Sequence, residues 1–232
     1  MIYQPSIFPL GLRIDEPVTV LTDLIVSAVC FYAWYKLGKL VKQNEVNRFL
    51  RLYFLTMGLA TLLGGIIGHG FLYALDSLFE YSYVVSPWKL PGWVVSMFSI
   101  TLVERASIEY TRPIVNSKTG KILAWINIIE LVIFLFIVFF SLNFWFVQVH
   151  AAYGLLLVVS SLNIYVYYKR KTLSSKIFLL AVGFAAIGAL VYMNQWSIDE
   201  WFNYFDISHL FMAASAYTFY KGARQLMNDP LL

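Results

Sequence analysis

Residues 122–142 read ILAWINIIELVIFLFIVFFSL, and Glu130 is the only charged side chain among them. A helix of this length covers ~30 Å at ~1.5 Å per residue, which is the thickness of the hydrocarbon layer of a membrane. The run is too apolar for a helix at the surface of a soluble protein. The sequence therefore predicts a transmembrane helix at these residues.

The composition of the whole chain also indicates a membrane protein. Of the 232 residues, 60% are hydrophobic and 13% are charged, which excludes a water-soluble globule with a polar coat. No linker rich in serine, glycine or proline divides the chain. We predict an all-α polytopic membrane protein, with residues 1–232 in a single domain of seven transmembrane helices. The predicted helices are Val18–Lys36, Leu52–Leu75, Gly92–Tyr110, Ile122–Leu142, Trp145–Tyr168, Ile177–Met193 and Tyr204–Tyr220.

The basic residues predict how the chain is oriented, because short cytoplasmic connections are enriched in Lys and Arg. All of the 17 Lys and Arg residues except Arg13, Lys89 and Arg105 lie in the first, third and fifth connections or near the carboxyl terminus. We therefore expect the amino terminus outside and the carboxyl terminus in the cytoplasm, in a multi-pass protein of the cell (inner) membrane. This distribution explains the net charge of +4 without a nucleic-acid partner.

Smaller signals flank the predicted helices. Asp15 is placed to cap free amides of the first helix, and Pro17 suits its first position. The single cysteine, Cys30, lies within that helix, where we expect it to pack. Amphipathic aromatic residues in the second and sixth connections predict segments at the membrane surface. These residues are Phe79, Tyr81, Tyr83, Trp88, Trp196 and Trp201.

Ionisable residues within membrane helices are costly, so they indicate candidate functional sites. Asp23, His69, His150, Asp206 and His209 each lie near the outer end of a predicted helix, and they include all three histidines of the chain. We expect these five residues to share one layer. Two stripes of residues at helical spacing each include one member of this layer, and their small and polar side chains can face the bundle centre. The stripes are Thr19, Asp23 and Ser27, and Gly58, Thr61, Gly65 and His69.

A second polar layer is expected nearer the cytoplasm. It consists of Glu104, Arg105, Asn127, Glu130 and Asn163. Because buried charges need partners, we expect Arg105 to pair with Glu130 or Glu104 and the layer to brace the bundle.

Three imidazoles and a carboxylate are the donor set of a catalytic zinc ion with an open position for water. We therefore predict zinc held by His69, His150 and His209, with Asp23 or Asp206 as catalytic base or as the partner that orients a ligand. Three alternatives stay open: unrelated interfacial histidines, haem held by two histidines, and a proton relay through the same residues. A retinal pigment is disfavoured, because no lysine lies in the middle of the seventh helix.

The layout resembles the superfamily of alkaline ceramidases and adiponectin receptors. The matching pieces are Glu16-Pro17 before a polar first helix, a glycine-rich second helix ending in GGIIGHG at 64–70, and DISH at 206–209. The resemblance implies a seven-helix membrane hydrolase with an intramembrane zinc, and it carries over only His69 and His209 as ligands. The chain departs from that family at Gly65, where the family has serine, and at Phe205 and Ala213, which flank His209 where the family has a second histidine. The aspartate that begins the family's third helix has no counterpart in Gly92–Ile100.

The leading functional hypothesis is a zinc-dependent hydrolase of a lipid amide or ester. A small proton-coupled or substrate-coupled transporter is the second hypothesis, with the outer His/Asp layer as binding site and Arg105 as part of a gate. The third is a receptor or subunit without catalysis. Membrane lipids are the expected partners in all three.

Overall fold

The computed structural model describes residues 4–40, 44–78 and 85–227. These residues are helical apart from connections and one isolated bridge between Ile7 and Ile14, so the all-α prediction is confirmed. The α-helices are α1 (Pro17–Gly38), α2 (Glu45–Leu63), α3 (Leu72–Ser77), α4 (Leu90–Thr111), α5 (Ser117–Ser141), α6 (Phe144–Ala152), α7 (Ser160–Arg170), α8 (Leu173–Met193) and α9 (Tyr204–Leu226).

Two of the long helices contain a π-helical turn. The segment Gly64–Gly70 continues α2, and Tyr153–Val159 joins α6 to α7. A π turn widens the helix locally and is common at functional sites. The helices therefore form long rods that correspond to the predicted runs.

Five of these rods are long and apolar enough to cross a membrane. They are Pro17–Gly38, Glu45–Gly70, Ser117–Ser141, Phe144–Arg170 and Leu173–Met193. The remaining two long helices, α4 and α9, are more polar, because α4 carries Glu104, Arg105 and Glu109 and α9 carries Asp206, Lys221 and Arg224. Both lie against several other helices, so less of their surface needs to be apolar.

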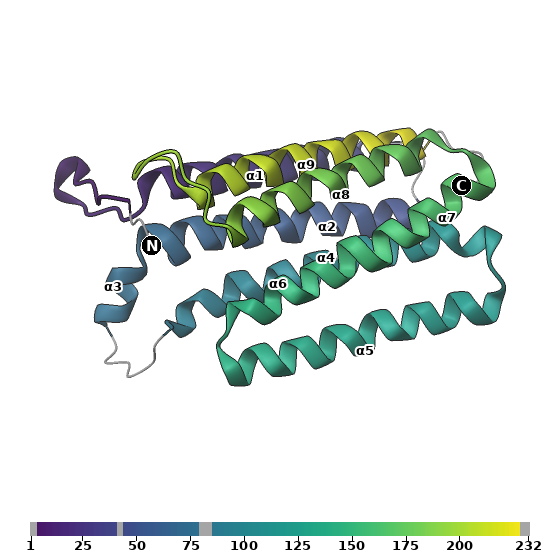
Figure 1. Ribbon diagram of the computed structural model, residues 1–232, viewed down its shortest axis with the longest axis horizontal. Coiled ribbons are helices and arrows are strands. Elements are labelled where there is room, and N and C mark those ends of the chain that lie inside the picture. The colour runs from purple at the N-terminus through teal and green to yellow at the C-terminus, as the bar shows by residue number, and fades with distance from the viewer. Residues whose placement is uncertain (1–3, 41–43, 79–84, 228–232) are drawn as a thin grey trace.

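The helices run roughly along one axis in Figure 1, where α1, α8 and α9 form one side, α2 and α4 lie in the middle, and α5 lies on the opposite side. The first and last helices are parallel neighbours. Thr19 near the start of α1 donates to Asp206 near the start of α9, and the rings of Tyr32 and Tyr220 meet farther along at 5.6 Å. We call the end of the bundle where α1 and α9 begin the α1 end.

Helix α5 turns a row of large apolar side chains outward. Trp125, Val132, Phe136 and Phe140 are each more than half exposed. A surface of this kind is stable in contact with lipid and not with water. The predicted polytopic architecture explains why the most apolar run of the chain is also among the least buried.

The glycine stripe of α2 lets α1 approach closely. A Cβ atom at Gly65 would lie 2.8 Å from Cβ of Asp23, and one at Gly58 would lie 2.9 Å from the ring of Phe31. Ser27 donates to the carbonyl of Gly58 at 2.9 Å. The prediction that both stripes face into the bundle is confirmed.

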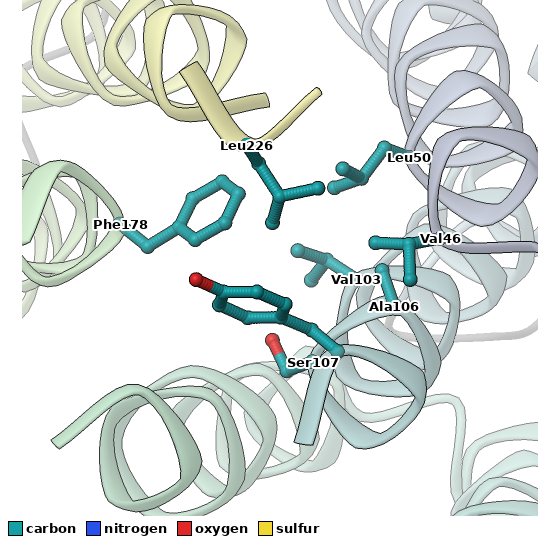
Figure 2. A pocket seen from close by; sticks show the side chains of 8 residues that line it. Val46, Leu50, Val103, Ala106, Ser107, Phe178 and Leu226 are labelled. Atoms are coloured by element: carbon teal, nitrogen blue, oxygen red, sulfur yellow. The ribbon is translucent and has the colours of Figure 1, made fainter. Parts of the chain in front are cut away.

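The opposite half of the bundle is closed by apolar packing. Figure 2 shows Leu50, Phe178 and Leu226 converging on a gap that has no room for a water molecule. Cys30 is fully buried, in agreement with the predicted packing role. In the described part of the chain, the polar side chains that could bind a ligand therefore lie at the α1 end and in the polar clusters.

The start of α1 differs from the prediction in one respect. Pro17 occupies the first turn as expected, but Asp15 caps no backbone amide and instead accepts hydrogen bonds from Arg13 and Ser6. The hydrogen bond from Arg13 to Asp15 raises the pKa of the Arg13 guanidinium, which lies on the surface. Gln4 takes the capping role, because its Oε1 accepts from the amides of Val18 and Thr19 at 3.1 and 3.3 Å.

Some predicted surface residues lie outside the described residues. These are Lys42, Phe79, Tyr81 and Tyr83. Trp196 and Trp201 lie in the connection before α9, and both are exposed, as expected of side chains at a membrane surface.

Candidate functional site

The α1 end brings Glu16, Asp23, His69 and His209 together. His69 lies in the π-helical segment Gly64–Gly70, and its Nδ1 makes a short hydrogen bond with Oε2 of Glu16. Glu16 has a left-handed backbone conformation, with φ of 44°. This conformation is unfavourable for a residue with a Cβ atom, and such residues are concentrated at functional sites.

Hydrogen bonds also fix the ring of His209. The Thr22 hydroxyl donates to the carbonyl of Thr19 at 3.0 Å, so it can accept from Nδ1–H of His209 at 3.1 Å. In the neutral imidazole this leaves the lone pair on Nε2. That nitrogen lies 3.6 Å from Oδ1 of Asp23, so a lone pair and a carboxylate face each other.

The two imidazoles are neighbours. The ring centroids of His69 and His209 are 6.3 Å apart, and the ring of Phe205 contacts both. The side chains of His69 and Glu16 keep 15% and 20% of their surface exposed, whereas Asp23 keeps 5%. The cluster can therefore be reached from the α1 end.

Asp206 is in the same region but has a different role. Its carboxylate accepts from Thr19, from Gln4 and from the backbone amide of Asn203, at 2.7 to 2.9 Å. Together with Asn203 it forms a capping box at the start of α9. Asp206 therefore fixes α9 against α1, and of the two aspartates Asp23 is the one that faces an imidazole, that of His209.

A hollow of about 240 Å³ opens beside this cluster. Its lining includes Trp145, Tyr192 and Tyr204. Tyr204 stacks on Phe205 with 4.4 Å between ring centroids, and Phe205 in turn contacts His69. One layer of aromatic rings thus separates the hollow from the two histidines.

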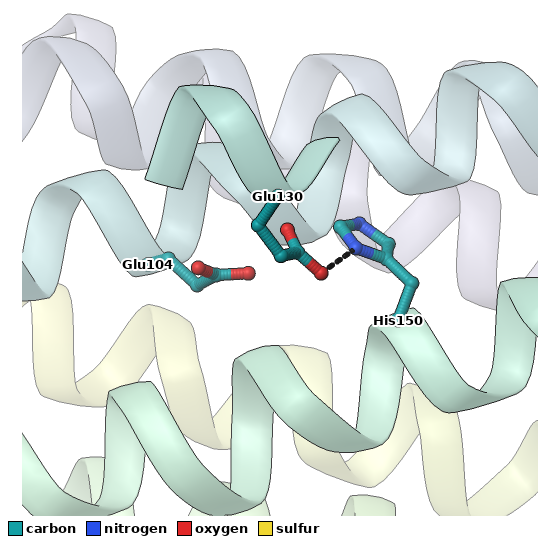
Figure 3. A group of neighbouring side chains, drawn as sticks. All are labelled: Glu104, Glu130 and His150. Carbon is teal, nitrogen blue, oxygen red and sulfur yellow. Dashed lines mark hydrogen bonds and ion pairs between the residues drawn. The ribbon is translucent and has the colours of Figure 1, made fainter. Parts of the chain in front are cut away.

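His150 does not join the other histidines, so the expected meeting of three imidazoles at one point is wrong. Figure 3 shows His150 beside Glu130 and Glu104. Among the described residues, these three form the group of metal-ligating side chains whose donor atoms all lie within 4.8 Å of one another. The group could hold a metal ion.

The expected pairing of Arg105 is also wrong. Its guanidinium pairs with Glu109 at 3.0 Å, one turn farther along α4, and donates to the carbonyl of Ala124. Glu104 accepts instead from Asn127 at 3.1 Å, and Glu130 contacts His150. Asn163 bonds within its own helix and to Ser107.

Three side chains that shape the α1 end were not among the predicted site residues: Gln4, Glu16 and Thr22. Glu16 carried a signal only in the Glu16-Pro17 pair that the resemblance includes. Thr22 and Gln4 carried none, since a threonine in a polar stripe and a glutamine in an irregular segment are common in any chain.

Comparison with known proteins gives one match. The model of a protein family described as Family of unknown function (DUF6962) matches residues 18–228. No curated protein matches. No solved structure matches.

Proposed function

The chain belongs to DUF6962, and on this premise we propose that it is an intramembrane zinc-dependent hydrolase of a lipid amide or ester. The proposed zinc ligands are His69, His209 and Asp23. The ring pair of His69 and His209, beside Asp23, is the observation that carries the proposal. These two histidines are also the ones that the resemblance to alkaline ceramidases and adiponectin receptors implies as ligands.

The donor set has the chemistry that zinc prefers, and because the donor atoms of Asp23, His69 and His209 do not all lie within 4.8 Å of one another, zinc binding would draw these side chains together. Each imidazole has one ring nitrogen bound by a protein group, Glu16 for His69 and Thr22 for His209, which leaves the other nitrogen for a metal. The 3.6 Å between His209 Nε2 and Asp23 Oδ1 is close to the ~3.4 Å expected between two ligands of a tetrahedral zinc. The carboxylates of Glu16 and Asp23 with two neutral imidazoles also carry two negative charges, which a divalent cation would balance.

When bound, zinc would make a nucleophile of water at neutral pH and polarise the carbonyl group of the substrate. The residues of the chain then position the reaction. Glu16 orients His69 and, being partly exposed, is placed to accept a proton. Asp206 holds the start of α9 against α1, so that His209 keeps its place.

A lipid substrate is favoured by the surroundings. The hollow, lined by Trp145, Tyr192, Met193 and Tyr204 together with Gln148 and Gln195, offers aromatic surface to an apolar chain. The exposed edge of Glu16 and His69 is suited to a polar head group. We further propose that α4 and α9 cross the membrane with the five apolar rods. The seven crossings would place the α1 end outside the cytoplasm.

Elemental analysis of the purified protein in detergent tests this function, together with hydrolysis of fluorescent acyl amides and esters in mixed micelles. His69→Ala and His209→Ala should each remove the zinc of this site and lower hydrolysis by on the order of 100-fold or more. Asn194→Ala is the matched control, because Asn194 is exposed and its amide bonds within its own helix. Full zinc content in both histidine variants would refute the proposal.

A further inference from the structure

The hydrogen bonds of His150 fix its tautomer in the middle of the bundle. Its Nε2 lies 3.0 Å from the carbonyl oxygen of Met97, which can only accept, so Nε2 carries a hydrogen. The lone pair of the neutral ring is then on Nδ1. That atom lies 2.7 Å from Oε1 of Glu130, so two acceptors face each other and a positive species is required between them.

The carboxylates of Glu104 and Glu130 also require a positively charged partner. Glu104 is fully buried and Glu130 nearly so, and each has one oxygen without a hydrogen-bond partner: Oε1 of Glu104 and Oε2 of Glu130. Unpartnered buried carboxylate oxygens are costly, and native structures rarely keep them. These oxygens therefore point to a missing ligand.

Among the described residues no Lys or Arg pairs with Glu104 or Glu130, and a protonated His150 would balance the charge of Glu130 alone. Arg105 is engaged with Glu109 and Ala124. Asn127 donates to one oxygen of Glu104 but brings no charge. Two protons, one on His150 and one on a carboxyl group, would balance the charges but bring no partner to Oε1 of Glu104 and Oε2 of Glu130, whereas a divalent cation would do both.

The packing leaves space for these ligands. A Cβ atom at Gly154 would lie 2.4 Å from Oε1 of Glu104, so only glycine leaves that oxygen in place. The three side chains come from α4, α5 and α6, and Figure 3 shows both glutamates and the His150 ring turned into the space between these helices. Their donor atoms lie within 4.8 Å of one another, near the ~4.4 Å that spans the ligand shell of one ion.

We propose that Glu104, Glu130 and His150 form a second metal site, which holds one divalent transition-metal ion between α4, α5 and α6. One imidazole and two carboxylates favour manganese, iron or zinc over calcium or magnesium, which prefer oxygen ligands alone. Met97 and Asn127 orient His150 and Glu104 by hydrogen bonds from outside the ligand shell. The site is separate from the proposed zinc site of His69 and His209.

Because the inner site is buried, its ion should exchange with solvent more slowly than the ion of the α1 end. His150 has no exposed surface, whereas His69 keeps 15% of its side chain exposed at the α1 end. A chelator should therefore remove the ion of the α1 end well before the ion of the inner site. The inner ion should also raise the midpoint of thermal unfolding by several degrees, because it binds only the folded bundle.

Metal counting in two double variants tests the proposal. The wild type should hold two ions per chain. The double variant His69→Ala, His209→Ala should hold one ion, and the double variant Glu104→Gln, Glu130→Gln should also hold one. Glu109→Gln is the matched control on α4, because Glu109 pairs with Arg105 and Arg112 outside the cluster. It should keep both ions.

Manganese(II) serves as the probe where a variant of the inner site fails to fold. After chelation, the His69→Ala, His209→Ala protein should bind one Mn²⁺ by electron paramagnetic resonance and unfold at a higher temperature than without it. If it binds none and its unfolding temperature does not change, the inner site is refuted and the zinc site is not. If the two glutamine substitutions leave metal content unchanged, the inner site is also refuted. If the glutamine double variant loses metal while the histidine double variant keeps all of its metal, the zinc site is refuted and the inner site is not.

Discussion

Thr22 links the proposed zinc site to the packing of α1 against α9. Its hydroxyl hydrogen can go to the carbonyl of Thr19 or to the carboxylate of Asp206, which leaves its oxygen to accept from Nδ1–H of His209. Groups that hold the second nitrogen of a ligating histidine set both its tautomer and its orientation.

Thr22→Val should therefore lower zinc affinity at the α1 end by about 10–100-fold, because the His209 ring loses its acceptor while the side-chain shape is kept. Competition with a zinc-binding dye measures the affinity. Thr218→Val is the matched control, since the Thr218 hydroxyl bonds only to the carbonyl of Ala214 in its own helix. Equal affinity in the two variants would mean that Thr22 does not position His209.

Residue depth along a helix was a partial guide to the site. Depth placed His69, His209 and Asp23 in one layer, and the structure brings these three together. It failed for His150, because depth says nothing about which neighbour a helix face meets. Helix α6 packs on α4 and α5, so His150 meets Glu130 from α5.

Charge pairing could not be settled from the sequence either. Arg105 has Glu104 beside it and Glu109 one turn away on the same face of α4, and the structure pairs it with Glu109. Residues four apart are neighbours on a helix, whereas adjacent residues point in different directions. That rule favours Glu109, which lies near the end of the predicted helix.

At the scale of elements, apolar runs predicted where helices lie better than where they begin. Helix α2 begins at Glu45, before the predicted Leu52, because Asn44 caps it by accepting from the amide of Asn47 at 2.8 Å. Helix α9 likewise continues past Tyr220 to Leu226. The added turns are amphipathic, so hydrophobicity alone could not find them.

Gly65 controls how closely the π-helical end of α2 approaches α1. In Gly65→Ala the new Cβ would lie 2.8 Å from Cβ of Asp23 and 3.4 Å from the carbonyl of Val20, so the two segments must move apart. We expect zinc affinity at the α1 end to fall more than tenfold, and metal at the Glu104, Glu130 and His150 cluster to stay. Isothermal titration calorimetry with zinc measures both.

Gly68→Ala is the control for this prediction, because it lies in the same π-helical segment and a Cβ there meets nothing within 4 Å. It should bind zinc like the wild type. If Gly65→Ala does so too, close approach of α1 and α2 is not required for the site.

At the scale of the whole molecule, the seven proposed crossings and the basic connections predict an orientation. Alkaline phosphatase, which is active only outside the cytoplasm, should be active when fused after Ser86 or Trp196. It should be inactive after Lys118 or at the carboxyl terminus, because those connections carry the basic residues. The reverse pattern would place the His69 and His209 cluster on the cytoplasmic side.

The parallel contact between α1 and α9 has a consequence for synthesis on the ribosome. Asp23 and Thr22 enter the membrane with the first helix, but their partner His209 is translated only after the helices that lie between α1 and α9. Until α9 leaves the ribosome, the growing chain must keep the polar helix α1 in the membrane without its partner, which is costly in lipid. A fragment that ends before Thr172 should therefore be retained by the insertion machinery or degraded. Co-expression of the remaining piece, with α8 and α9, should rescue it.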